Sequence, residues 1–171
     1  LGNFKIGATK HIVFDLDETL GSFRDLHWLV TSRGAGLDTL PELLRVFPEF
    51  LRDGIVTVLQ FLHRKKAAKE FGDLYVYTNN QCGREWTEHL VRAIEDVCGT
   101  PGLFDQIVCA FKIDNVIVES GRTTHRKTWN DFVQCTLLPP KAHICFIDDT
   151  YFPKMSQSRV FYIQPRPYFH T

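Results

Sequence analysis

The chain has 171 residues, so we expect residues 1–171 to form a single domain that buries a core without disulfide bonds. Hydrophobic residues make up 44% of the sequence, a content that excludes a disordered chain. Lysine and arginine together number 20, as do aspartate and glutamate, which gives a formal net charge of zero. This balance argues against a protein that binds nucleic acid directly or lies on a membrane surface.

Five cysteines are present, and none forms a Cys-x-x-Cys pair. Their odd number and the apolar runs around three of them indicate reduced thiols, which are typical of intracellular proteins. We therefore expect a protein of the cytoplasm or the nucleus. No apolar run reaches the length of a membrane span, and no signal peptide is visible.

Short apolar runs alternate with segments of helical periodicity along the chain. The apolar runs predict strands, because a strand that is covered on both faces is apolar throughout. These strands are expected at residues 12–14, 74–77, 107–110, 144–147 and 160–163, with a shorter candidate at 116–118.

Helices are expected between the strands. The first predicted helix covers residues 48–62, whose apolar side chains fall on one helical face. It begins at Pro48, which suits a first helical turn. The second covers residues 86–97 and ends at Gly99, and a third covers residues 129–133. Residues 21–46 predict an irregular or partly helical insertion. The alternation predicts an α/β fold, with a doubly wound, Rossmann-like, mostly parallel sheet and helices on both faces.

Three of the predicted strands are followed by a polar residue of a particular kind: Asp15, Thr78 and Asp148. In a parallel sheet these ends lie along one edge, which is where open α/β sheets bind their ligands. The sequence therefore predicts a site that contains two carboxylates and a hydroxyl group.

The segment from Asp15 to Thr19, Asp-Leu-Asp-Glu-Thr, is the most informative part of the chain. Each part of the predicted site also has a structural interpretation, because acidic residues and threonine favour turns and helix caps. Asp15 and the Asp148-Asp149 pair could each form an acidic turn, and Thr78 could cap a helix. Charged groups at the end of an apolar strand are costly when unpaired, and a divalent cation with oxygen ligands would lower that cost.

Four motifs resemble the haloacid dehalogenase (HAD) superfamily. Residues 15–20, DLDETL, resemble its DxDxT signature, and Thr78, Lys127 and Asp148-Asp149 resemble its second, third and fourth motifs. The motifs keep the family's order between residues 11 and 150. Within the superfamily, the pattern without a large cap domain is most similar to the phosphatases that act on the C-terminal domain of RNA polymerase II, and to their small relatives.

The resemblance implies a HAD-like fold without a large cap domain and a phosphatase that depends on Mg²⁺. Asp15 would be the nucleophile that forms an aspartyl-phosphate, and Asp17 the general acid and base. Thr78, Asn79 and Lys127 would bind the phosphoryl group, with Asn79 and Asn80 leading into the N-terminus of a helix. The resemblance also implies a metal site, whose ligands would be Asp15, Asp17 through its backbone carbonyl, Asp148 and Asp149.

Several alternatives stay open at this stage. Arg126 and Lys112 compete with Lys127 for the cationic role. The expected substrate is a phosphoserine or phosphothreonine on a protein chain, but a nucleotide or sugar phosphate is an alternative, as is a binding module without activity. Arg24, Trp28 and Arg33 are candidates for substrate contacts in the insertion. Two features depart from the polymerase-phosphatase pattern: Gly21 after Leu20, and Asp148-Asp149-Thr150 in place of an acid followed by Asn-Ser.

Overall fold

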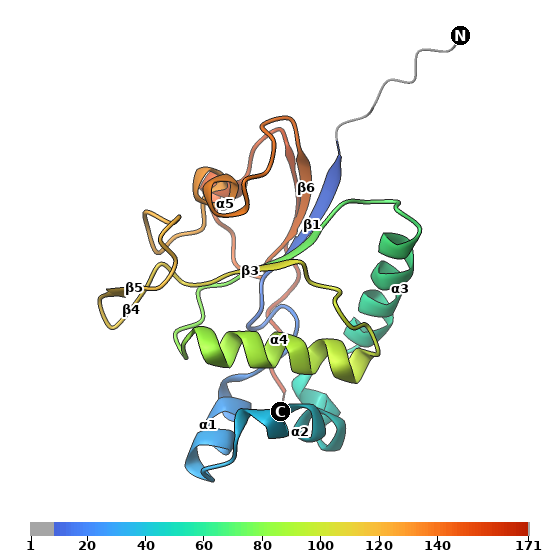
Figure 1. The fold of residues 1–171 in the computed structure, drawn as a ribbon, viewed down its shortest axis with the longest axis vertical. Coiled ribbons are helices and arrows are strands. Elements are labelled where there is room, and N and C mark those ends of the chain that lie inside the picture. Colours follow the sequence, from blue (N-terminus) through green and yellow to red (C-terminus); the bar gives the residue numbers. More distant parts are fainter. Residues whose placement is uncertain (1–8, 171) are drawn as a thin grey trace.

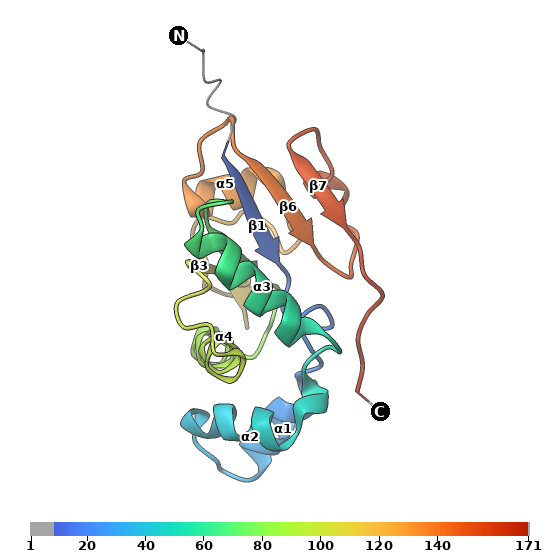
Figure 2. The same cartoon turned by 90° about the vertical axis from the view of Figure 1, so that its right-hand side faces the viewer.

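The computed structural model describes residues 9–170, and a five-stranded parallel sheet forms its centre. The strands lie in the order β3-β2-β1-β6-β7, and each neighbouring pair is parallel (Figures 1 and 2). Their bounds are β1 Lys10–Phe14, β2 Leu74–Tyr77, β3 Gln106–Val108, β6 His143–Ile147 and β7 Val160–Ile163. The five predicted strands are confirmed, although β3 ends at Val108 rather than at residue 110.

Helices cover both faces of the sheet. On one face lie α3 (Ile55–Ala67) and α4 (Arg84–Cys98), whose Leu59 and Leu90 share a core with Phe14 of β1. On the other face lies α5 (Trp129–Thr136), whose Phe132 packs in a second core with Val13. Figure 1 shows α5 on one side of β1 and β6 and α3 on the other. This arrangement confirms the predicted doubly wound α/β fold.

One predicted helix boundary needs correction. The first helix begins at Ile55 and not near Pro48, because Gly54 adopts a left-handed conformation (φ 79°) that interrupts the helical backbone. Pro48 instead starts a short 3-10 turn, η2 (Pro48–Phe50), which still buries Phe50 in the core. The predicted end of α4 is correct, since Gly99 closes that helix in the left-handed region.

The segment between β1 and α3 forms a small helical insertion. It contains α1 (Arg24–Ser32), a 3-10 turn η1 (Leu37–Thr39) and α2 (Leu40–Val46). Leu26, Val30, Leu40 and Leu44 bury their side chains in the core that contains Phe14. In Figures 1 and 2 these helices lie beyond the carboxyl edge of the sheet, near α4. Over residues 9–170 the insertion is thus an extension of the main core, and no large cap domain is present.

A two-stranded antiparallel hairpin follows β3. It pairs β4 (Lys112–Ile113) with β5 (Val116–Ile117), which confirms the short strand expected near residue 116. Its turn residues Asp114 and Asn115 both adopt positive φ, as a type I′ hairpin turn requires.

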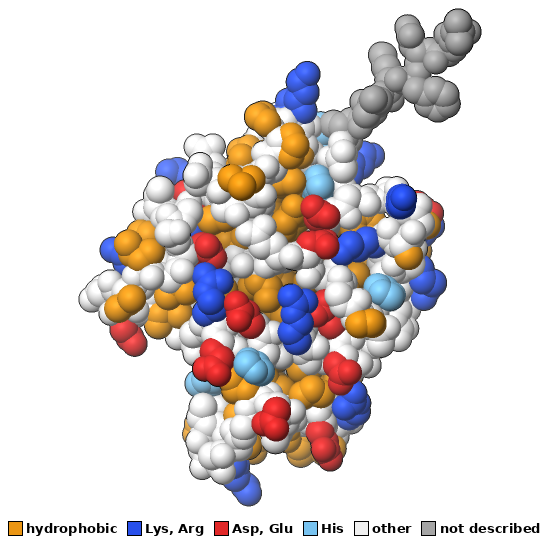
Figure 3. Space-filling model, in the orientation of Figure 1, with side chains coloured by type: hydrophobic (Ala, Val, Ile, Leu, Met, Phe, Trp, Pro, Cys, Tyr) orange, Lys and Arg blue, Asp and Glu red, His pale blue; other side chains and the backbone are white. Residues whose placement is uncertain are grey.

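The surface that Figure 3 shows has basic and acidic side chains intermixed, in keeping with the balanced composition. Among the helices of the described residues, none is both long enough and apolar enough to cross a membrane.

The strand order defines where a ligand would bind. From β1 the chain proceeds to β2 and β3 on one side of the sheet, and later to β6 and β7 on the other. The switch point therefore lies between β1 and β6, the position at which open α/β sheets form their binding crevice. Asp15 directly follows β1 and Asp148 directly follows β6, so both carboxyl groups lie at this point.

Candidate active site

A cavity of about 200 Å³ lies at the carboxyl edge of the sheet. The side chains that the four motifs and the resemblance assigned to the site all line this one cavity: Asp15, Asp17, Thr78, Asn79, Lys127, Asp148 and Asp149. Glu18, Asn80, Thr150 and Phe152 complete the lining. The structure thus brings the four motifs together, and the roles of the residues stay predictions.

Lys127 links the carboxyl groups that follow β1 and β6. Its Nζ lies 2.6 Å from Oδ1 of Asp15 and 2.6 Å from Oδ2 of Asp148. Burial lowers the pKa of Lys127, but the two carboxylates outweigh this effect and the net shift is upward. Burial raises the pKa of the Asp148 carboxyl, and the Lys127 ammonium opposes that rise. The ammonium is therefore fixed as a cation between two acids.

Three carboxylates gather at the switch point. One oxygen from each of Asp15, Asp148 and Asp149 lies within 4.8 Å of the other two. The Thr19 hydroxyl is 3.1 Å from Oδ2 of Asp15 and 2.9 Å from Oδ1 of Asp149, yet it has one hydrogen to donate. With Lys127 as their paired cation, the three acids keep an excess of negative charge. This oxygen-rich, negatively charged set fits Mg²⁺.

The two acids of the fourth motif differ in what they contact. Both oxygens of Asp148 are engaged, one by Lys127 and the other by the backbone N–H of Thr150 at 2.9 Å. The Asp149 carboxyl accepts a hydrogen bond from the Thr19 hydroxyl through Oδ1 and lies close to Asp15. Burial, followed by smaller contributions that include the charge of Asp15, raises the pKa of Asp149. Asp149 is therefore better placed than Asp148 to offer a free oxygen to a cation.

Asp17 faces the same cavity and is half-buried. Burial raises the pKa of its carboxyl to about 6, although a hydrogen bond from Asn80 opposes the shift. The Asn80 Nδ2 group donates to Oδ2 of Asp17 at 2.8 Å. A carboxyl group with such a pKa can give up or take a proton near neutral pH, which general acid–base catalysis requires.

Thr78 is almost completely buried and follows β2. Its hydroxyl oxygen accepts a hydrogen bond from the Asn80 backbone N–H at 3.0 Å. The hydroxyl hydrogen is therefore available to an oxygen of a ligand. As expected, Asn79 and Asn80 precede a helix, but α4 begins only at Arg84, after Gly83 with a φ of 104°. The amides of α4 are thus set apart from Thr78 along the chain.

Arg122, which the sequence did not single out, holds the loop that follows β2 through hydrogen bonds. It is 2% exposed, and its guanidinium donates to the carbonyl oxygens of Thr78 (3.0 Å) and Cys109 (2.8 Å). It also donates to Oδ1 of Asn79 at 2.8 Å. One side chain therefore joins the ends of β2 and β3. No sequence pattern indicates this role, because an arginine after Gly121 is typical of an ordinary surface loop.

Arg52 is a second contributor that the sequence did not indicate. Its guanidinium donates to the backbone carbonyls of Thr19 (2.6 Å) and Glu18 (2.7 Å), within the loop that follows the nucleophile candidate. Glu18 adopts a left-handed conformation with φ 60°, which is costly for a residue with a side chain. The same guanidinium donates to the carbonyl of Arg166, and the Tyr168 N–H donates to the Glu18 carbonyl. Arg52 and the C-terminal segment together hold the loop in this conformation.

The remaining candidates lie outside the cavity. Arg24, Trp28 and Arg33 are exposed on or next to α1 and do not line it. Lys112 lies on the β4–β5 hairpin, and Arg126 lines an adjoining cavity of about 160 Å³. Of the three cations considered from the sequence, Lys127 alone contacts Asp15 and Asp148.

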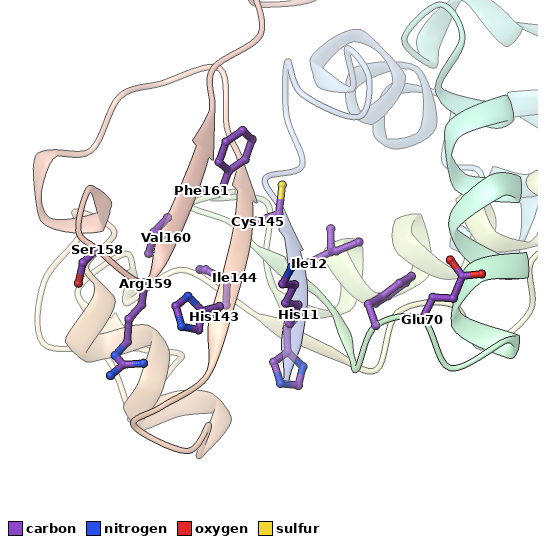
Figure 4. Close-up of a pocket in the computed structure, with 12 residues that line it drawn as sticks. His11, Ile12, Glu70, His143, Ile144, Cys145, Ser158, Arg159, Val160 and Phe161 are labelled. Carbon is purple, nitrogen blue, oxygen red and sulfur yellow. The ribbon is translucent and has the colours of Figure 1, made fainter. Parts of the chain in front are cut away.

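A wider pocket of about 520 Å³ lies at the opposite end of the sheet, beside the starts of β1, β6 and β7 (Figure 4). Its wall is largely apolar, with Ile12, Cys145 and Phe161 among the lining side chains. His11 lines it too, but its Nδ1 already accepts a hydrogen bond from the Asp73 N–H. No group of metal-binding side chains was found there among the described residues. The acidic cavity is therefore the candidate active site.

The sequence matches no protein-family model, and no curated protein matches it. Among solved structures, the chain is similar to YfnB of Bacillus subtilis, which is described as a HAD-hydrolase and was solved with magnesium bound. The sequence identity is 15% and the TM-score is 0.38, and the match covers 84% of this chain and 82% of YfnB. At this level of similarity the activity of the chain does not follow from the match, so a function has to be inferred from the site itself.

Proposed function

We propose that this protein is a Mg²⁺-dependent phosphomonoester hydrolase that forms an aspartyl-phosphate on Asp15. The observation that supports the proposal most directly is the bridge of Lys127 between Asp15 and Asp148 at the switch point of the sheet. A buried cation beside a carboxylate nucleophile lowers the repulsion between that carboxylate and an anionic phosphate ester.

The proposed reaction has two steps. In the first, a carboxylate oxygen of Asp15 bonds to phosphorus while the bond from phosphorus to the leaving oxygen breaks, and Asp17 gives its proton to that oxygen. In the second, ionised Asp17 takes a proton from a water molecule that attacks the phosphorus. The bond between phosphorus and Asp15 breaks, inorganic phosphate leaves, and both acids return to their starting states.

The other residues of the cavity hold the phosphoryl group and balance its charge. The free hydroxyl hydrogen of Thr78 suits a phosphoryl oxygen, and the buried Lys127 ammonium stabilises negative charge close to Asp15. Bound Mg²⁺ would neutralise further charge on the phosphoryl oxygens, held by Asp15, the backbone carbonyl of Asp17 and Asp149. Asp148 would act mainly by orienting Lys127.

A phosphoserine or phosphothreonine on a protein chain is the substrate that we propose. The cavity is small, about 200 Å³, and the insertion of α1 and α2 is too short to form a domain that encloses it. Such a cavity fits a phosphoryl group and the atoms next to it, while the rest of a peptide lies outside. The resemblance of residues 15–20 to the RNA polymerase II C-terminal-domain phosphatases agrees with this substrate class.

The test compares Asp15→Asn with the unchanged protein in assays of phosphate release from phosphopeptides, nucleotides and sugar phosphates, each with and without Mg²⁺. We expect Mg²⁺-dependent release from phosphopeptides, abolished by the substitution while the circular dichroism spectrum is unchanged. Retained activity in Asp15→Asn would disprove the nucleophile. Faster turnover of free nucleotides or sugar phosphates would favour a small-molecule phosphatase. A chain without activity that binds phosphopeptides but no beryllofluoride would be a binding module.

A further inference from the structure

Asn80 makes three hydrogen bonds that lock its position beside Asp17. Its backbone N–H donates to the Thr78 hydroxyl at 3.0 Å, and its side-chain carbonyl Oδ1 accepts from the Cys82 backbone N–H at 2.8 Å. Its Nδ2 group donates to Oδ2 of Asp17 at 2.8 Å. The side chain thus spans the cavity edge between the loop after β2 and the loop after β1.

The contact with Cys82 fixes which end of the Asn80 amide faces Asp17. A backbone N–H only donates, so its partner has to be the carbonyl oxygen of the amide. The NH₂ end must then point at Asp17, and the reversed orientation would leave two donors and two acceptors facing each other. The orientation therefore follows from the hydrogen-bond network.

This orientation determines which oxygen of Asp17 can carry a proton. An NH₂ group has no acceptor, so Oδ2 of Asp17 accepts a hydrogen bond whether the carboxyl is protonated or ionised. A carbonyl oxygen accepts this bond better than a protonated oxygen does, so the acidic proton is favoured on Oδ1. Among the described residues, Asn80 is the one side chain that hydrogen-bonds to the Asp17 carboxyl.

We propose that Asn80 is a positioning residue that directs the protonated oxygen of Asp17 toward the leaving group of the substrate. This inference rests on the proposed function, and it adds a residue to which the sequence motifs assign no such role. In the first step the proton moves from Oδ1 of Asp17 to the leaving oxygen as its bond to phosphorus breaks, and Oδ2 keeps its hydrogen bond to Asn80 throughout. Without Asn80 the carboxyl group can rotate and place its proton elsewhere.

The inference predicts that substitution of Asn80 lowers kcat/KM by a factor that depends on the leaving group of the substrate. Alkyl phosphates such as phosphoserine need a proton on the departing oxygen, whereas p-nitrophenyl phosphate releases a stable anion and needs little help. In Asn80→Ala we expect kcat/KM to fall about 10- to 100-fold on phosphoserine peptides, a part of the usual contribution of general acid catalysis. On p-nitrophenyl phosphate we expect a change of less than about threefold, because the acid contributes little there.

The parameter kcat/KM suits this test because it covers the chemistry up to departure of the leaving group and excludes hydrolysis of the aspartyl-phosphate. Asp17→Ala supplies the reference, with the same dependence on leaving group and a larger loss. Gln81→Ala is the matched control, since Gln81 is exposed in the same loop and does not contact Asp17. Asn80→Ser is a second variant, whose hydroxyl can accept from Cys82 but is too short to reach Asp17.

The possible outcomes separate the two proposals. A selective loss on phosphoserine in Asn80→Ala and Asn80→Ser supports the inference. An equal loss on both substrates, or none on either, overturns it while leaving the proposed function intact. An unchanged protein that releases no phosphate with Mg²⁺ overturns the proposed function and the inference together. If Asn80→Ala does not fold, by circular dichroism, the result with Asn80→Ser decides.

Discussion

The Lys127 ammonium lies 2.6 Å from a carboxylate oxygen of Asp15 and 2.6 Å from one of Asp148, and all three side chains are almost completely buried. Removal of this cation would leave two acids facing each other with reduced access to water. In Lys127→Met we therefore expect the free energy of unfolding to fall by about 3–5 kcal/mol, the usual cost of an unpaired buried charge. Phosphate release should be lost as well. Urea denaturation and the phosphate assay measure the two effects.

The same variant tests whether a cation binds at this site. Mg²⁺ should stabilise Lys127→Met more than the unchanged protein, because it replaces part of the missing positive charge. Lys154→Met, at an exposed position, is the control and should behave like the unchanged protein. Equal effects of Mg²⁺ on the melting temperatures of all three proteins would argue against a cation among these carboxylates.

Arg52 should matter for activity even though it lies outside the cavity. Arg52→Ala removes the hydrogen bonds to the Glu18 and Thr19 carbonyls and the bond to Arg166. Hydrogen bonds from a charged donor stabilise a fold by about 1.5–3 kcal/mol, so we expect a loss of this order in the free energy of unfolding. The loop after Asp15 should also become mobile, which lowers kcat.

Arg45→Ala is the comparison for Arg52→Ala. Arg45 pairs with Asp96 on the surface, where both side chains are more than half exposed. Such a pair contributes about 0–1 kcal/mol, so its loss should leave stability and kcat nearly unchanged. A similar result for the two arginine variants would show that the Arg52 hydrogen bonds do not hold the loop.

His11 makes the fold sensitive to acid at a place far from the candidate active site. Burial lowers its pKa below the ordinary value of 6.5, and its Nδ1 accepts the Asp73 N–H. The unfolded chain therefore binds a proton more readily than the folded one, so stability is full above pH 6.5 and falls as the pH drops below that value. His11→Asn keeps an acceptor that does not titrate, and we expect it to lose less stability than the unchanged protein between about pH 8 and about pH 5.5. The exposed His89→Asn serves as control, and urea denaturation at the two pH values gives the comparison.

The sequence contained most of the information about the fold because apolar runs report burial directly. The strands at residues 12–14 and 144–147 were readable from their apolar side chains, and the position of Asp15 and Asp148 after them placed both acids at one edge. The start of α3 was misjudged because Phe50 belongs to the same apolar stripe as Ile55, although the backbone changes direction at Gly54. Periodicity records which side chains are buried, but it does not record a break in the backbone.

The supporting residues of the site could not be predicted in the same way. Arg52, Asn80 and Arg122 act through hydrogen bonds to backbone carbonyls or to side chains far away along the chain. Such contacts depend on the way the loops approach one another in space and leave no pattern in the spacing of residues. The sequence also did not decide whether Asp148 or Asp149 is the better candidate to bind a cation. The difference arises because the Lys127 ammonium and the Thr150 N–H bind the two carboxylate oxygens of Asp148.

Leu137 offers a stabilising substitution that is independent of the candidate active site. It ends α5 in a left-handed conformation, with φ 56° and ψ 30°, and its side chain is 81% exposed. A side chain in this conformation costs about 1–2 kcal/mol, whereas glycine adopts it freely and is the preferred residue after a helix. Part of the gain is offset because glycine also makes the unfolded chain more flexible. In Leu137→Gly we therefore expect the free energy of unfolding to rise by about 0.5–1 kcal/mol.

Leu137→Ala removes the exposed side chain but keeps Cβ, so it should leave the stability nearly unchanged. Urea denaturation of the two variants separates the backbone effect from the loss of the side chain, and equal stabilities would show that the strain at Leu137 is negligible.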